Sequence, residues 1–228
     1  MTLNIEDKTY TIPERLTIGQ WNQCIQWDFE DESHWPRLIS IITGAPLDKL
    51  SAAPLAGLEL GIRLIGQIAN QREEATMIDV SKLMFGQFVD LEVCLGLGVD
   101  HKLQNMIDIL NPEIEYVDEA LYVVQTYINW RNTLYKQYSN LFGLNEESDE
   151  DDIDDLENPI KDPHAVSRSW YRVMVQLSND NILNLDAVAE EGVIKTLNFM
   201  AHQKQQALEE NAKILNQKRT HDLQTNRR

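Results

Sequence analysis

Two short stretches of this chain share one pattern, which constrains its fold more than any other feature. Leu16-Thr17-Ile18-Gly19-Gln20-Trp21 and Leu83-Met84-Phe85-Gly86-Gln87-Phe88 both read leucine, any residue, an apolar residue, Gly-Gln and an aromatic residue. Thr17 and Gln20 fit a capping box, so a helix should begin near Ile18. At helical spacing the apolar and aromatic positions share one face. Both stretches therefore predict helix openings that seat an aromatic ring in a core.

Two interpretations of this duplication stay open. The stretches are either a duplicated docking element or two helices that begin with similar packing needs. Six matched positions without a sustained period are thin support for a repeat, so we favour the packing interpretation. The residues assigned to this structural motif are Gly19, Gln20, Trp21, Gly86, Gln87 and Phe88.

Turn and periodicity signals predict a mainly α protein of the α+β class. Leu3–Ile5 and Thr9–Ile12 read as a hairpin, and Ala75–Val80 is the best candidate for a third strand. The rest favours a helical bundle, in which Asp100 is expected to cap one helix. Gly57 and Gly61 would let another helix approach the apolar helix of residues 54–71. The longest periodic segment runs over residues 117–142.

A strongly acidic stretch divides the chain. Nine carboxylates crowd residues 145–158, and so many like charges repel one another and resist burial. The sequence therefore predicts an α+β domain over 1–144, an acidic flexible linker over 145–161 and a C-terminal helical region over 162–228. The carboxylates lack the register of a calcium loop, while an acidic lure for a basic partner remains an alternative.

No catalytic constellation stands out. The nucleophile-elbow, zinc-protease and P-loop motifs are absent, and Cys24 and Cys94 stand apart from any metal-ligand cluster. His34 among nearby acids is explained by a charged loop without an ion. The net charge of -17 repels nucleic acid phosphates. We expect no cofactor, no metal, no nucleic-acid or membrane partner, and synthesis in the cytosol.

The C-terminal helix is expected to be weakly anchored. From Val193 onward it carries apolar residues at helical spacing, but Lys204 and Asn211 occupy slots where a strong coiled coil would have leucine. Its last turns are expected either to fray or to bind a partner. The candidate partner-binding residues are Trp170, Tyr171, Leu208 and Leu215.

A family resemblance lies in the N-terminal hairpin, the two Gly-Gln-aromatic stretches and the tail with Trp170-Tyr171, Ile182-Leu183 and Leu197-Asn198-Phe199. Together these segments resemble T4-type tailed-phage baseplate hub assembly proteins and related tail assembly chaperones. The resemblance implies a non-enzymatic morphogenesis protein that binds other tail or baseplate proteins. It would act in the host cytoplasm during assembly or stay in the virion tail, and its oligomeric state is open. The alternatives are a metal-dependent enzyme that uses the acidic residues and an inhibitor that mimics nucleic acid.

Overall fold

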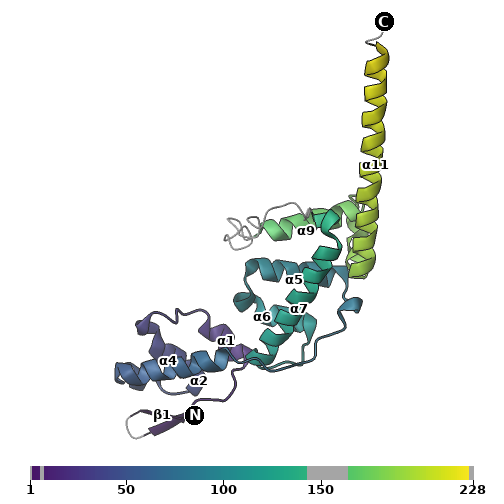
Figure 1. Cartoon of the computed structure of the whole chain (residues 1–228). Coiled ribbons are helices and arrows are strands. Elements are labelled where there is room, and N and C mark those ends of the chain that lie inside the picture. Colours follow the sequence, from purple (N-terminus) through teal and green to yellow (C-terminus); the bar gives the residue numbers. More distant parts are fainter. Residues whose placement is uncertain (1, 6–7, 143–163, 226–228) are drawn as a thin grey trace. The chain divides into compact units, whose positions relative to one another are not determined.

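The computed structural model describes residues 2–5, 8–142 and 164–225 (Figure 1). Over this part the chain is mostly helical, at 72%, with one small antiparallel sheet of two strands, so the mainly α prediction is confirmed. The strands are β1 Thr2–Ile5 and β2 Lys8–Thr11. The α-helices are α1 Ile18–Cys24, α2 Trp35–Thr43, α3 Leu47–Ser51, α4 Leu55–Ala69, α5 Phe85–Leu97, α6 Val99–Leu110, α7 Val117–Gln137, α8 Ser139–Phe142, α9 Ala165–Leu177, α10 Leu185–Ala189 and α11 Val193–Thr225. Short 3₁₀ helices are η1 Glu32–His34, η2 Val80–Lys82 and η4 Ile182–Asn184.

The hairpin forms as predicted, but the third strand does not. β1 and β2 pair from Thr2 opposite Thr11 to Ile5 opposite Lys8. Residues 75–79 have no strand pairing, because their backbone bonds go elsewhere. The N–H of Ile78 donates to the carbonyl of Leu110 at 3.0 Å, at the end of α6. This segment therefore bonds to the end of α6 and does not extend the sheet.

The described residues fall into two compact units. Unit 1 contains residues 1–80 and 90–128, and unit 2 contains 81–89 and 129–228. Helices α5 and α7 each contribute residues to both units. The division therefore differs from the predicted boundary at residue 144, because residues 81–89 and 129–142 group with the C-terminal helices. The predicted acidic linker, 145–161, lies outside the described residues.

Unit 1 is built on a close approach of α2 and α4. A Cβ atom added to Gly61 would stand 2.9 Å from Cδ1 of Ile39, so only glycine permits this approach without a shift. The expectation for Gly61 is confirmed. Gly57 has open space around it and has no such role.

Residues just before α1 and α7 pair across unit 1. The N–H of Ile18 donates to the carbonyl of Glu115 at 2.9 Å, and the N–H of Val117 donates to Leu16 at 2.9 Å. Beside this bridge the Arg15 guanidinium binds both carboxylate oxygens of Asp118, each at 2.7 Å. The pairing satisfies backbone groups at two helix starts that have no partner within their own helices.

Unit 2 repeats the same backbone pairing. The N–H of Phe85 donates to the carbonyl of Glu191 at 2.7 Å, and the N–H of Val193 donates to Leu83 at 3.0 Å. Here the bridge joins the starts of α5 and α11. The duplication seen in sequence is therefore a duplicated bridge between the start of a Gly-Gln-aromatic helix and the start of a later helix.

Aromatic side chains fill the core of unit 2. Phe85 and Phe88 are fully buried, and the ring of Trp170 from α9 meets both edge-on, with centroid separations of 5.9 and 5.3 Å. Trp130 from α7 and Phe142 from α8 extend the cluster. This cluster holds α9 against the start of α5.

Several helix boundaries follow local signals, and two differ from prediction. The capping box of Thr17 and Gln20 is present, and Gly44 ends α2 with a φ of 70°. Asp100 does not cap α6: it lies in the first turn of the helix, which begins at Val99 with Gly98 as its N-cap. The segment predicted over 117–142 is two helices, because α7 ends at Gln137 and α8 begins at Ser139.

Candidate partner-binding surface

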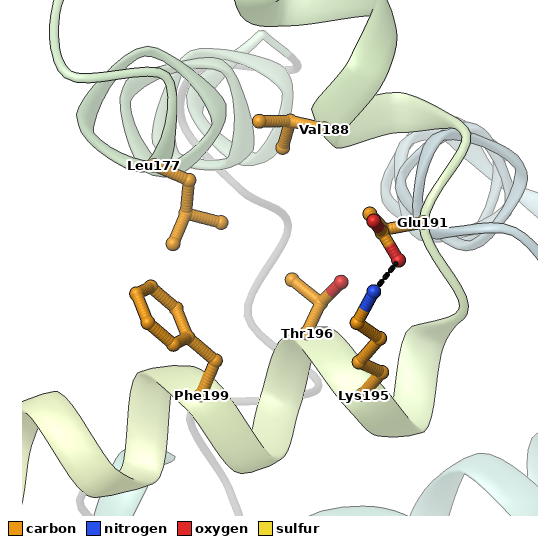
Figure 2. A pocket seen from close by; sticks show the side chains of 6 residues that line it. All are labelled: Leu177, Val188, Glu191, Lys195, Thr196 and Phe199. Atoms are coloured by element: carbon orange, nitrogen blue, oxygen red, sulfur yellow. Dashed lines mark hydrogen bonds and ion pairs between the residues drawn. The ribbon is translucent and has the colours of Figure 1, made fainter.

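A small apolar cavity opens between α9, α10 and α11. It measures about 300 Å³ and is lined by Leu177, Val188, Glu191, Lys195, Thr196 and Phe199. Figure 2 shows Leu177 and Val188 facing Phe199 across it, while the ion pair of Lys195 and Glu191 closes one side. The Nζ of Lys195 lies 2.6 Å from a carboxylate oxygen of Glu191. The cavity is at the lower end of the size range of small-molecule sites, and its lining suits an apolar side chain.

The turn after α9 places two apolar residues in solvent. Asn179 and Asp180 both have left-handed backbones, with φ of 55° and 57°, a conformation that these residue types tolerate. The turn ends α9 and directs the chain into η4, where the side chain of Asn181 accepts from the N–H of Leu183. Ile182 and Leu183 are consequently 75% and 84% exposed.

Exposed apolar side chains concentrate on this part of unit 2. Eleven large apolar residues are exposed in the described chain, and seven of them fall between residues 171 and 215. These are Tyr171, Ile182, Leu183, Phe199, Leu208, Ile214 and Leu215. Single exposed apolar residues are ordinary, whereas several of them on one face of a helix are typical of a binding surface.

The part of α11 from Leu208 onward carries three of these side chains on one face. Leu208, Ile214 and Leu215 are 56%, 45% and 56% exposed. In Figure 1 the yellow end of α11 continues past α9. An isolated helix gains little stability from propensity alone, and exposed apolar side chains on one face of a helix form a candidate binding surface.

The candidate partner-binding residues separate into two groups. Tyr171, Leu208 and Leu215 are all 56% exposed and can reach a partner. Trp170 is only 9% exposed, and its ring packs among the buried phenylalanines. We therefore assign Trp170 to the core of unit 2.

The two glutamines of the motif bond to the backbone at the helix starts. The side chain of Gln20 accepts from the N–H of Thr17, and Gln87 accepts in the same way from Met84, each at 3.1 Å. Phe88 is buried, whereas Trp21 is only half-buried. The prediction that the aromatic ring of the motif lies in a core therefore holds for Phe88, whereas Trp21 is only partly buried.

The two glycines of the motif differ. A Cβ on Gly86 would lie 3.0 Å from the Cβ of Ala189 and 3.3 Å from its carbonyl oxygen, so glycine lets α5 begin against the end of α10. The nearest atom to a Cβ on Gly19 is the Thr17 hydroxyl, at 3.9 Å. Nothing in the structure requires glycine at position 19.

Two carboxylates are buried in the described part of the chain, and both have hydrogen-bond partners. Asp118 binds Arg15, whose own pKa the ion pair raises, and whose guanidinium lies over the ring of Tyr116. Glu92 accepts from the hydroxyl of Tyr127 at 3.3 Å. Within the described residues no group of three or more histidine, cysteine or acidic side chains is placed to hold a metal ion.

His34 lies in an aromatic and charged turn. Its ring meets that of Trp27 edge-on at 5.2 Å, and its Nε2 lies 3.8 Å from a carboxylate oxygen of Asp31. Hydrogen bonds from Ser33 lower the pKa of Asp31, which caps η1. These contacts place His34 and Asp31 in a capped turn.

Four exposed apolar residues of this candidate surface were not assigned from the sequence: Phe199, Ile214, Ile182 and Leu183. Ile214 had a usable signal, because it stands next to Leu215 and seven residues after Ala207.

No helix in the described part of the chain has the length and apolar character needed to cross a bilayer. Comparison with family models, with curated proteins and with solved structures finds no match.

Proposed function

We propose that this protein is a non-enzymatic assembly factor of a phage tail or baseplate, which binds other tail proteins as a hub component or an assembly chaperone. The observation that carries the binding role is the exposed apolar face of α11, formed by Leu208, Ile214 and Leu215. The class of partner rests on the resemblance of the hairpin, the Gly-Gln-aromatic stretches and the tail to phage assembly proteins. The protein would work in the host cytoplasm, and it would either leave the finished tail or remain in it.

The shape of this surface favours a protein partner over a small substrate. The neighbouring cavity of about 300 Å³ offers few polar groups, namely one ion pair and Thr196 among otherwise apolar walls. A helix face of leucine and isoleucine has no groups that act on a substrate. Such a face fits helix-in-groove or helix-on-helix recognition, in which anchors recur at three- and four-residue spacing.

The test is affinity purification of the tagged full-length chain from infected cells, followed by mass spectrometry. The Leu208→Asp/Leu215→Asp double variant should lose a tail or baseplate protein that the parent chain retains. The matched control is Gln206→Asp/Gln217→Asp, which adds the same charge on the other side of α11. Far-ultraviolet circular dichroism checks that both variants keep their helices.

The proposal is contradicted if no tail protein accompanies the parent chain, or if both double variants retain it equally. The first result would remove the assigned class of partner. The second would remove α11 as the binding element.

A further inference from the structure

The exposed face of α11 has a regular apolar repeat. Three apolar pairs follow one another at seven-residue intervals: Met200-Ala201, Ala207-Leu208 and Ile214-Leu215. Seven residues are close to two turns of helix, so the pairs stand above one another on one face. We call this the α11 stripe.

The first part of the stripe borders other helices of unit 2, with Met200 half-buried and Ala207 exposed. Met200 and Ala207 line a cavity with Leu141 of α8 and with Val173 and Leu177 of α9. Beyond them Leu208, Ile214 and Leu215 are exposed. The stripe therefore continues a packed helix face into solvent, which indicates that another helix can extend the same packing.

The polar residues within the stripe are basic or neutral. Lys204, Asn211 and Lys218 recur at the same seven-residue interval and lie among the apolar pairs. At about 100° per residue, Glu209 and Lys213 fall on the opposite side of the helix, and Glu210 falls at the edge of the stripe. The stripe thus combines leucine and isoleucine with positive charge and contains no acid.

Lys204 shows which partner a lysine in the stripe binds. Its Nζ donates to the carbonyls of Asn140 and Leu141, the latter at 3.2 Å, at the end of α8. A lysine here meets the negative end of a helix. Lys218, two heptads further along, is exposed and should meet negative charge in the same way.

A second copy of α11 fits this stripe poorly. Parallel pairing in register would place Lys218 against Lys218 and Lys204 against Lys204. Antiparallel pairing centred on Asn211 would place Lys204 against Lys218. Both arrangements bring like charges together in the contact, which opposes self-association.

We propose that the α11 stripe binds an amphipathic helix of another protein, whose apolar residues repeat at heptad spacing and are flanked by glutamate or aspartate. This inference rests on the proposed function and names the chemistry of its partner. The described helices around the stripe do not repel such a partner, since residues 164–218 carry six basic and six acidic side chains. The free part of the stripe, from Ala207 to Lys218, is about 18 Å long at 1.5 Å per residue. A contact of this length should be weak and rapidly reversible.

The test compares two synthetic helical peptides that share leucines at heptad spacing. One has glutamate and the other lysine at the flanking positions, and fluorescence anisotropy measures their binding to the full-length chain. We expect the acidic peptide to bind about fivefold tighter at low salt, as one exposed ion pair allows. Lys218→Glu should abolish this preference, and Leu208→Asp should weaken both peptides. Gln206→Asp should change neither.

Three results would overturn the inference: equal binding of both peptides, tighter binding of the basic peptide, or no binding of either. Self-association in sedimentation velocity that Leu208→Asp abolishes would also overturn it, because a second copy would then occupy the stripe. If the acidic peptide fails while a tail protein still depends on Leu208 and Leu215, the inference fails and the proposed function stands. If the acidic peptide binds but no tail protein does, the inference stands and the proposed function fails.

Discussion

The ring of Trp170 meets the ring of Phe88 edge-on, with the two centroids 5.3 Å apart and the planes at 88°. This contact joins α9 to the second Gly-Gln-aromatic helix inside unit 2. It is the edge-to-face arrangement that the charge distribution of aromatic rings favours. The first Gly-Gln-aromatic helix has a looser counterpart, since Trp21 meets Phe29 at 6.2 Å and is half-buried.

Phe88→Ala should therefore cost more stability than Trp21→Ala. Truncating the fully buried Phe88 should lower the free energy of unfolding by about 3–5 kcal/mol. Trp21 keeps solvent contact, and its indole N–H has no hydrogen-bond partner within the described chain, so we expect a loss of roughly 1–3 kcal/mol. Urea unfolding followed by circular dichroism measures both. Equal losses would show that the two aromatics are equally packed.

Gly86→Ala and Gly19→Ala should have opposite effects. The new methyl at position 86 would press on Ala189, and such crowding costs about 1–3 kcal/mol. At position 19 there is space, and alanine is a better helix former than glycine by up to about 1 kcal/mol. Thermal unfolding should show a lower midpoint for Gly86→Ala and an unchanged or higher one for Gly19→Ala. A destabilised Gly19→Ala variant would contradict the open space seen there.

Arg15→Ala should destabilise unit 1. It would leave the carboxylate of Asp118, which is 6% exposed, without its two charge-assisted bonds. Hydrogen bonds to charged groups contribute about 1.5–3 kcal/mol, and we expect a loss of that size. The Arg15→Ala/Asp118→Asn double variant should lose less than the sum of the two single changes. Additive losses in urea unfolding would show that the pair is not coupled.

Cys24 should make stability fall at alkaline pH. Burial raises the pKa of this thiol from 9.0 to about 11, so the folded chain holds a proton that the unfolded chain releases. The stability that this group contributes is complete below pH 9 and is lost as the pH rises toward 11, with a limit of roughly 2–3 kcal/mol. Unfolding free energies at several pH values should fall less steeply over this window for Cys24→Ala. Identical slopes would contradict the pKa shift.

Local chemistry was sufficient to predict much of the secondary structure. The capping box at Thr17, the left-handed Gly44 and the close approach at Gly61 each depend on a few neighbouring residues or on one residue type. The expected strand at residues 75–80 was wrong because Ile78 bonds to Leu110. No local pattern shows that bond.

The division into units depends on contacts that are distant in sequence. Phe85 pairs with Glu191, and this pairing brings the second Gly-Gln-aromatic helix together with α11. The sequence predicted a helix start at each place but not their pairing. It also placed Trp170 on a binding surface, because the periodicity that marks a core face also marks a docking face.

The most direct test of the assembly role is site-specific photo-cross-linking from α11 in infected cells. A photoreactive phenylalanine analogue replaces Leu208 in one variant and Gln206, on the other side of the helix, in a second. We expect a tail or baseplate protein to be cross-linked from position 208 and not from position 206. Equal cross-linking from both positions, or no tail protein from position 208, would contradict it.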